Sequence, residues 1–414
     1  MLPVSAFLVV LLTFLSSNCF GQARAALPKL TGNYAVGRTF VLWTDSSRQE
    51  NPALGAGPPR HIPAYIYYPA LRGTKIANYY PRLSAVKTPS NIAALASQFG
   101  DAWKLVQADT IETHSFEDAP LSKGKETFPI LFFSPGMGLP VSSYSAQLEN
   151  LASHGYVVVA LEHPYDTALV VLPDGTTIIA TPEPDSGPPT MEGLKKDLAR
   201  EDVRMADTEF ALLHLTEIES QKKQLKGRLD TQRIGILGHS MGGKVAVRIC
   251  QSETRFRGCL NQDGGLFNAD PRTLTIVPAV EPAQSTKAPL FNIDVKFAIP
   301  PIPDETIRKQ IAQWQQKKTE ALAAFLSQNR SQTYIASIAT EGFSHLSFTD
   351  IPLLSAIATG KDTRNAATNL EMVNEFNLVF FDAVLKQEQQ ALKSLLVQHP
   401  KDITMRATSV PVQH

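Results

Sequence analysis

The sequence predicts an α/β fold with a mostly parallel central sheet and helices on both faces. Short apolar runs alternate along the chain with longer segments whose apolar residues recur at helical spacing, which is typical of parallel strands joined by crossover helices. The chain has 414 residues, 43% of them hydrophobic, so it is long enough to bury a large core. No internal repeat or low-complexity linker divides it. We therefore expect residues 26–414 to form a single domain.

The strands are expected in two groups. Thr39–Trp43 and Ala64–Tyr68 come first and suit an antiparallel start of the sheet. A small hairpin is expected where Asp174-Gly175, a favoured two-residue turn, separates 169–172 from 176–180. The remaining strands are Ile130–Phe133, Tyr156–Leu161, Ile234–Leu237, Cys259–Gln262, Pro289–Ile293 and Gln332–Ile338.

Helices are expected wherever apolar residues recur every three or four positions. The segment 90–110 has partly helical spacing and is interpreted as a helix packed on the sheet, with a lid or an interfacial helix as the alternative. Two long connections are expected to build the pocket, namely 70–127 and the pair 264–288 and 295–329 on either side of one predicted strand. The expected helices are Ser143–Ser153, Gly193–Glu219, Gly242–Gln251, Glu305–Ser327 and Leu370–Leu385.

The charges are balanced, with 39 basic and 39 acidic residues and a formal net charge of zero. No basic block stands out in the sequence. This pattern argues against nucleic acid as a partner and against electrostatic capture on an anionic membrane. Nothing in the composition specifies an oligomeric state.

The N-terminus has the pattern of an export signal. Ala6–Leu15 is apolar except for Thr13, polar residues follow, and Ala23-Arg24-Ala25 offers a small-x-small cleavage site. Residues 1–25 are therefore predicted to be a signal peptide of a secreted or periplasmic protein, because the apolar stretch is too short to span a bilayer. The alternative is an apolar N-terminal helix packed on the domain.

Two cysteines, Cys250 and Cys259, follow the predicted signal peptide. One bridge is possible in an oxidising compartment. We expect two buried free thiols, because buried cysteines commonly pack as small hydrophobic residues.

The candidate nucleophile lies in the Gly-His-Ser-Met-Gly sequence of residues 238–242. This segment separates an apolar run from a helix-compatible run, which is the strand, turn and helix arrangement of an α/β-hydrolase nucleophile elbow. Glycines are needed there because strand and helix approach closely around a strained serine. Ser240 is the expected nucleophile, and a flexible turn is the alternative.

A serine hydroxyl is a weak nucleophile that needs a base, and the base needs an acid to orient it. In this fold the chain order is serine, acid, histidine. Of the three histidines downstream of Ser240, only His345 follows a predicted strand, so His345 is the expected base. Asp263 and Asp294 each end a predicted strand; strand position in many α/β-hydrolases favours Asp294, and spacing alone leaves both open.

A series of motifs runs along the chain: Phe133–Gly138, Leu151–Tyr156, Glu162-His163, Gly238–Gly243, Arg255–Asp263 and Gly342–Asp350. The series resembles that of the platelet-activating factor acetylhydrolase family, whose members carry a similar F-S-H-G-x-G, L-A-S-H-G-[FY] and E-H series. The likeness runs in order from about Gly37 to Asp350 and departs from the family pattern at Pro135 and between 264 and 329.

The resemblance implies specific roles for several residues. Asp263 would be the acid, and the backbone N–H groups of Met137 and Met241 would form the oxyanion hole. The implied reaction is hydrolysis of a short acyl ester on a lipid, an acetylated ether phospholipid in the family, with transient contact to a lipid surface. The alternatives are a general short-chain esterase or polyester hydrolase, and a catalytically silent lipid-binding relative.

No cofactor is expected for this chemistry. The sequence has no dinucleotide-binding or P-loop glycine motif, and the spacing of His154, His163 and His239 matches no recognisable metal site. Structural hydrogen bonds are the expected role of these three histidines.

Overall fold

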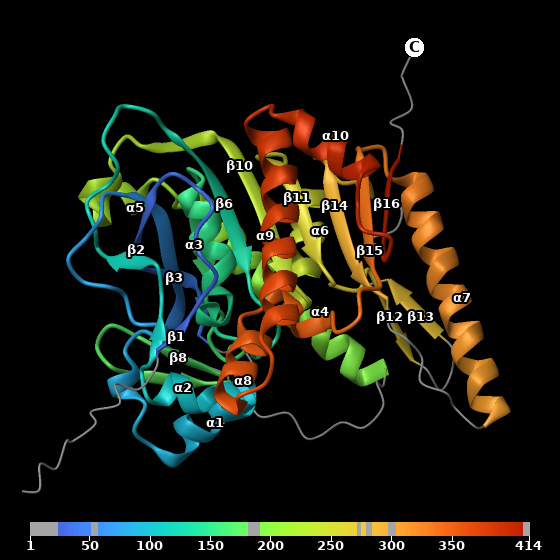
Figure 1. The fold of residues 1–414 in the computed structure, drawn as a ribbon, viewed down its shortest axis with the longest axis horizontal. Helices are drawn as coiled ribbons and strands as arrows, with labels where there is room; N and C mark the ends of the chain where they lie inside the picture. Colours follow the sequence, from blue (N-terminus) through green and yellow to red (C-terminus); the bar gives the residue numbers. More distant parts are fainter. Residues whose placement is uncertain are drawn as a thin grey trace, which may run out of the picture.

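A ten-stranded sheet forms the centre of the computed structural model, which describes residues 24–50, 57–180, 191–270, 275–278, 284–296 and 304–408. Within these residues the strand order is β16-β15-β14-β11-β10-β6-β7-β3-β2-β5 (Figure 1). The strands are β2 (Ala35–Gln49), β3 (Pro59–Ala70), β5 (Ser115–Glu117), β6 (Phe128–Ser134), β7 (Val157–Leu161), β10 (Leu229–His239), β11 (Phe256–Gln262), β14 (Leu290–Val295), β15 (Thr333–Ile338) and β16 (Ile403–Ala407).

The middle of this sheet is parallel. From β7 through β6, β10, β11 and β14 to β15, each strand pairs in parallel with the next. β3 runs antiparallel to both β7 and β2, and β16 runs antiparallel to β15. Every residue of β6 and β7 is buried, which explains their continuous apolar runs, because strands covered on both faces have no polar side. The predicted mostly parallel α/β-hydrolase sheet is confirmed.

Helices cover both faces of the sheet. α3 and α9 pack into one hydrophobic core, and α4 and α6 pack into the core on the opposite face; Figure 1 shows α9 in front of the strands and α6 behind them. The helices are α1 (Pro89–Phe99), α2 (Trp103–Gln107), α3 (Ser145–Ser153), α4 (Met191–Leu213), α5 (Glu217–Gln221), α6 (Met241–Ser252), α7 (Glu305–Gln328), α8 (Ile351–Thr359), α9 (Arg364–Leu385) and α10 (Gln389–Val397).

Several short strands and 3-10 turns lie outside the ten-stranded sheet and its covering helices. The predicted hairpin is present as β8 (Leu169–Val171) and β9 (Thr177–Ile179). A second hairpin, β12 (Phe267–Asp270) and β13 (Thr275–Pro278), lies in a connection expected to be a loop, and β1 (Ala25–Ala26) pairs with β4 (Ile111–Glu112). The 3-10 turns are η2 (Leu83–Ala85), η3 (Gly100–Ala102), η4 (Val141–Tyr144), η5 (Lys223–Leu225) and η6 (His345–Phe348).

The single helix predicted over Gly193–Glu219 is wrong. α4 ends at Leu213, and a turn leads into the separate short helix α5. In that turn the N–H of Glu217 donates to the oxygen of His214, and the N–H of Ile218 donates to Leu215. These bonds span three residues rather than four, so the chain tightens there and the α-helical ladder stops.

The segment 90–110 forms α1, η3 and α2 and packs into the core. Leu95 and Phe99 of α1 are fully buried. A Cβ at Gly138 would come within 2.9 Å of the Gln98 side chain, so α1 also abuts the loop that follows β6. The segment is therefore two short helices that pack into the core beside the β8–β9 hairpin and α8, rather than one helix on the central sheet.

The expectation of two free thiols is wrong. Cys250, near the end of α6, and Cys259, in β11, form a disulfide with their Cα atoms 6.4 Å apart. Both side chains are fully buried. The bridge is possible because α6 packs directly beside β11, so the two side chains face each other across the helix–sheet interface.

Most of the predicted signal peptide lies outside the described residues, which begin at Arg24. Among the residues that are described, none of the helices is long and apolar enough to cross a membrane.

Candidate active site

Ser240 occupies a sharp turn between β10 and α6. Its backbone has φ 55° and ψ −120°, a conformation that costs a side-chain-bearing residue about 1–3 kcal/mol. A Cβ at Gly238 would overlap the backbone of Gly242, and a Cβ at Gly242 would overlap the carbonyl of Ser134. Only glycines fit at these two positions, and the tight turn lifts the serine side chain clear of both strand and helix.

Three side chains from separate elements meet at this turn. The Oγ of Ser240 lies 2.9 Å from Nε2 of His345, and Nδ1 of His345 lies 2.7 Å from Oδ2 of Asp263. An ionised carboxylate only accepts hydrogen bonds, so the proton on Nδ1 points to Asp263 and Nε2 accepts from the serine hydroxyl. The array can therefore remove a proton from Ser240 and hold the resulting imidazolium.

Asp263 reaches His345 because the chain turns sharply after β11. Its backbone φ is 53°, its N–H donates to the oxygen of Ile293 at 2.7 Å, and its Oδ1 accepts from the N–H of Val295 at 3.0 Å. Asp294 belongs to the neighbouring strand β14, where it accepts a 2.8 Å hydrogen bond from the side chain of Asn292. The structure thus places Asp263 against the histidine and ties Asp294 to its own strand.

Two backbone N–H groups, those of Met137 and Met241, belong to the two segments that meet at the serine turn. Met241 is the first residue of α6, and a first-turn N–H has no partner within its helix. The carbonyl of Gly136 accepts from the N–H of Leu139 at 3.2 Å and from Nη2 of Arg204 at 3.4 Å. The Gly136 carbonyl and the Met137 N–H belong to the same peptide group, and in a trans peptide these two groups point in opposite directions. Because the carbonyl points toward Arg204, the N–H of Met137 points away from it.

The loop of residues 135–139 that follows β6, called the glycine loop below, carries Met137 and packs against the serine turn. A Cβ at Gly136 would lie 3.0 Å from Nδ1 of His239, and Met137 itself is 48% exposed. Among the described residues, neither the Met137 nor the Met241 N–H has a protein acceptor outside helical bonding. Both donors are available at the junction where the predicted oxyanion hole would lie.

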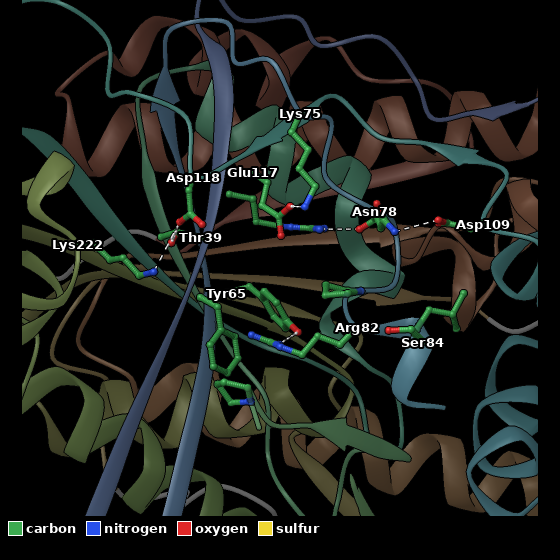
Figure 2. A pocket seen from close by; sticks show the side chains of 15 residues that line it. Thr39, Tyr65, Lys75, Asn78, Arg82, Ser84, Asp109, Glu117, Asp118 and Lys222 are labelled. Atoms are coloured by element: carbon green, nitrogen blue, oxygen red, sulfur yellow. Dashed lines mark hydrogen bonds and ion pairs between the residues drawn. The ribbon is translucent and has the colours of Figure 1, made fainter. Parts of the chain in front are cut away.

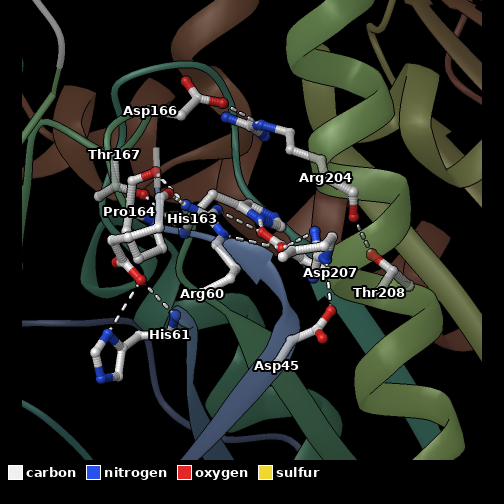
Figure 3. Close-up of polar contacts among 12 residues, drawn as sticks. Asp45, Arg60, His61, His163, Pro164, Asp166, Thr167, Arg204, Asp207 and Thr208 are labelled. Carbon is white, nitrogen blue, oxygen red and sulfur yellow. Dashed lines mark hydrogen bonds and ion pairs between the residues drawn. The ribbon is translucent and has the colours of Figure 1, made fainter. Parts of the chain in front are cut away.

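Arg204 of α4 binds the same loop, and Figure 3 shows its side chain beside Asp166. Its guanidinium is 1% exposed and donates to the carbonyl oxygens of Pro135 and Gly136. Its Nε forms an ion pair with Asp166. Burial alone would raise the pKa of Asp166, but Arg204 keeps that pKa below its usual value, so the pair stays charged and the loop carbonyls keep their donor.

A second hydrogen-bonded series of serine, histidine and aspartate lies at the end of β6, next to the glycine loop. Ser134 Oγ lies 3.1 Å from Nε2 of His163, and Nδ1 of His163 lies 3.0 Å from Oδ2 of Asp207. Asp207 also binds Arg60 through two hydrogen bonds of 2.7 and 3.1 Å. All four side chains are at most 2% exposed, so no substrate reaches them and the row serves to fix the end of β6.

His239 links the glycine loop to the loop of His345. The N–H of Gly136 donates to the hydroxyl of Tyr144 at 2.8 Å; this hydroxyl lies 2.9 Å from Nδ1 of His239, whose Nε2 lies 2.8 Å from the oxygen of His345. Burial holds the pKa of His239 well below its usual value, so the ring is neutral. Because a carbonyl only accepts, Nε2 carries the proton and Nδ1 accepts from Tyr144.

Histidines outside the array make local contacts, as predicted. His154 bonds the hydroxyl of Thr31 at 2.8 Å, while His163 and His239 hold the networks described above. In the part of the chain that the structure describes, no group of three or more His, Cys, Asp or Glu side chains has a geometry suited to a metal ion.

The sheet order and the serine turn define the α/β-hydrolase class. The profile of the family "Platelet-activating factor acetylhydrolase, isoform II" matches residues 20–173 and 201–396. The chain therefore belongs to the platelet-activating factor acetylhydrolase family, as the motifs predicted.

Named relatives carry esterase titles. A "Probable 1-alkyl-2-acetylglycerophosphocholine esterase" of Arthroderma benhamiae is 27% identical over 254 residues, which cover 58% of this chain and 59% of that protein. A platelet-activating factor acetylhydrolase of Cavia porcellus is 25% identical over 386 residues, 87% of this chain and 78% of that protein. The structure of a ferulic acid esterase from Streptomyces cinnamoneus matches the fold, with a TM-score of 0.67 at 21% identity over 92% of this chain and 99% of that one.

The choice between the two aspartates gives the first prediction. Asp263→Asn keeps the shape of the side chain but reverses the preferred tautomer of His345, so we expect kcat for ester hydrolysis to fall about 10⁴-fold. The matched control is Asp294→Asn, which changes the neighbouring strand and should cost less than about tenfold. Steady-state kinetics on both variants, with circular dichroism to show that each is folded, makes the comparison. If the Asp294→Asn variant loses its activity and the Asp263→Asn variant keeps it, the acid that orients His345 is Asp294, at the end of the later strand.

The second prediction concerns Arg204. Arg204→Met keeps the bulk of the side chain but removes the donors to the glycine loop, so we expect kcat to fall roughly 10²-fold with KM little changed, because oxyanion donors bind the transition state more strongly than the substrate. Arg248→Met is the matched control, since Arg248 of α6 pairs with Glu201 and Asp202 of the same helix α4. Equal kcat values for the two folded variants would remove the loop-positioning role.

Proposed function

We propose that the protein is a serine carboxylic ester hydrolase that releases a short acyl group from a lipid or phospholipid through an acyl-serine intermediate. The observation that carries this proposal is the continuous row of hydrogen bonds from Asp263 through His345 to Ser240. Near it are two backbone N–H groups that have no acceptor among the described residues outside helical bonding. Nucleophile, base and oxyanion donors then lie together, which is the geometry that acyl transfer requires.

The proposed reaction has two halves. Ser240 Oγ attacks the ester carbonyl while His345 takes its proton, and the tetrahedral oxyanion forms within reach of the Met137 and Met241 N–H groups. His345 then gives the proton to the leaving alkoxide, which departs as an alcohol and leaves the acyl group on Ser240. Water attacks the acyl-serine with His345 again acting as base, and the carboxylic acid leaves.

Asp263 orients the histidine and stabilises its imidazolium form in both halves. All the groups needed for this cycle are side chains and amides of the chain itself, so the proposed mechanism uses no metal or organic cofactor. A chelator should therefore leave the rate unchanged, in contrast to its effect on a metal-dependent phospholipase.

The substrate class is proposed from the family. One relative is named as a probable 1-alkyl-2-acetylglycerophosphocholine esterase and another as a platelet-activating factor acetylhydrolase. The exposed side chains of Met137 and Leu346, 48% and 40% accessible, flank the array with apolar surface. This surface suits a lipid substrate presented transiently at an interface. We further propose export, with residues 1–25 as signal peptide and 26–414 as the catalytic domain.

Hydrolysis of a panel of esters tests the substrate class. We expect acetyl and other short acyl chains to give the highest kcat/KM, and a phosphocholine head group to raise it further. Each methylene accepted or refused by the acyl pocket should change kcat/KM about 10-fold or more. Equal rates on esters with and without the head group would favour a general short-chain esterase or polyester hydrolase.

A lipid-binding relative without activity is the candidate from another class. Turnover of no ester, together with binding of phospholipid vesicles by the folded protein, would favour it over the hydrolase.

A further inference from the structure

A cavity of about 670 Å³ opens at the edge of the sheet where β5 leaves β2 (Figure 2). None of its lining residues belongs to the Ser240 array or to the glycine loop. β2 lies four strands away from β10 in the sheet order, which corresponds to ~19 Å at ~4.8 Å for each strand. The cavity is therefore a site separate from the proposed active site, with a volume in the range of small-molecule pockets.

Arg82 is held in this cavity by an aromatic ring. Its guanidinium carbon lies 4.1 Å from the centre of the Phe40 ring, and its Nη1 donates to the hydroxyl of Tyr65 at 3.1 Å and to the oxygen of Val171 at 3.4 Å. Its backbone is left-handed, with φ 56° and ψ 30°, a cost that the surrounding packing has to offset. Among the described residues, Nε and Nη2 have no acceptor, so their N–H groups are available to a ligand.

A second arginine contributes charge beside the first. Arg38 lines the cavity, is 4% exposed, and donates from Nη2 to the oxygen of Asn78 at 2.6 Å. Its guanidinium carbon lies 5.8 Å from the centre of the Tyr65 ring, and Tyr65 packs edge-on against Phe40 with ring centres 5.2 Å apart. Two rigid aromatic rings thus hold two guanidinium groups in the wall of one cavity.

These rings hold the arginines without neutralising them. Elsewhere the buried Arg60 and Arg204 each pair with an aspartate. By contrast, no described carboxylate lies within ion-pair distance of Arg38 or Arg82, and the buried Glu149 acts on Arg38 only at longer range. Aromatic rings attract a cation through a quadrupole but carry no formal charge, so the positive charge of both arginines persists in the cavity.

The remaining charges in the wall largely compensate one another. Lys75 pairs with Glu117, and Lys222 pairs with Asp118. Asp109 accepts a 2.9 Å hydrogen bond from the side chain of Asn78; Figure 2 shows Asp109 and Asn78 facing each other, apart from the contact between Arg82 and Tyr65. The wall as a whole carries four cations against three carboxylates. The excess is positive and is concentrated at the arginines.

We propose that this cavity binds the phosphate group of a small phosphomonoester or of a lipid head group, with Arg82 as the contacting residue and Arg38 supporting it. A guanidinium fork matches two phosphate oxygens at once, and Arg82 offers Nε and Nη2 on one edge of that fork. The cavity is larger than a single phosphate needs, which leaves room for the rest of the molecule beside Pro81, Leu83 and Pro173.

Calorimetric titration of the full-length protein tests the proposal in two arms. The first arm uses inorganic phosphate and glycerol 3-phosphate, and the second uses phosphatidylcholine vesicles with and without phosphatidic acid. Saturable binding in the first arm assigns a soluble phosphomonoester, and binding only to the vesicles that contain phosphatidic acid assigns a lipid head group. Wild-type protein that binds in neither arm overturns the proposal.

Variants locate the binding. Arg82→Met should weaken the affinity about tenfold or more through loss of a charge-assisted contact. Arg364→Met is the matched control, because Arg364 is 87% exposed, pairs with Asp362, and lies outside the cavity; it should bind like the wild type. Equal weakening in both variants overturns the proposal, since it would reflect net charge alone.

A second variant covers the case in which Arg82→Met does not fold. Arg82→Lys keeps the charge but loses the fork, so it should retain partial affinity for phosphate; wild-type affinity in the folded lysine variant contradicts the role of the fork. Both Arg82 variants should hydrolyse short esters at the wild-type rate, because the cavity is remote from Ser240. The phosphate-binding result can therefore be judged independently of whether the protein proves to be a hydrolase.

Discussion

The strained backbone of Ser240 is the constraint on which the candidate site depends. A residue with a side chain holds φ 55° and ψ −120° only where its surroundings leave no alternative. The Ser240 N–H donates to the oxygen of Gln262 at 2.8 Å, and the Ser240 carbonyl accepts from Gly243 and Lys244 at 3.0 and 3.2 Å. The turn is therefore fixed from the neighbouring strand and from its own helix, and the hydroxyl points where the loop of His345 brings a base.

Helix α4 supplies the support for the opposite wall of the site. It buries two charged side chains toward the end of β6: Arg204 binds the carbonyls of the glycine loop, and Asp207 binds His163 and Arg60. Buried charges are costly unless they are paired and hydrogen-bonded. Arg204 and Asp207 both have such partners. Displacing α4 would therefore leave buried charges unpaired and remove the hydrogen bonds that hold the glycine loop. In this arrangement, the packing of helix α4 also holds the position of the loop that carries the proposed oxyanion donor, the Met137 N–H.

The sequence was sufficient for features that depend on local pattern. The apolar runs predicted the parallel strands, since buried strands have no polar side, and the glycines around Ser240 predicted a turn that only glycines permit. Chain order predicted His345 as a neighbour of Ser240. Asp263 and Asp294 were equivalent by spacing, and the resemblance to a family favoured the one that the structure places against the histidine.

Features that depend on distant contacts could not be predicted. Arg60 and Asp207 are 147 residues apart, and nothing local marks their pairing. The disulfide depends on the orientation of α6 over β11 rather than on the cysteine count, and the end of α4 at Leu213 carries neither glycine nor proline as a signal. The aromatic support of Arg82 likewise joins β2, β3 and a loop that are remote in the sequence.

The central claim is that Ser240 forms a covalent bond with the acyl group of its substrate. Intact-protein mass spectrometry after reaction with a fluorophosphonate, followed by peptide mapping, tests it most directly, because the reagent phosphonylates a serine that an adjacent base activates and releases fluoride. We predict one adduct on Ser240, and neither adduct nor ester hydrolysis in a folded Ser240→Ala variant. An adduct on another residue, or ester turnover by the folded alanine variant, would contradict the account.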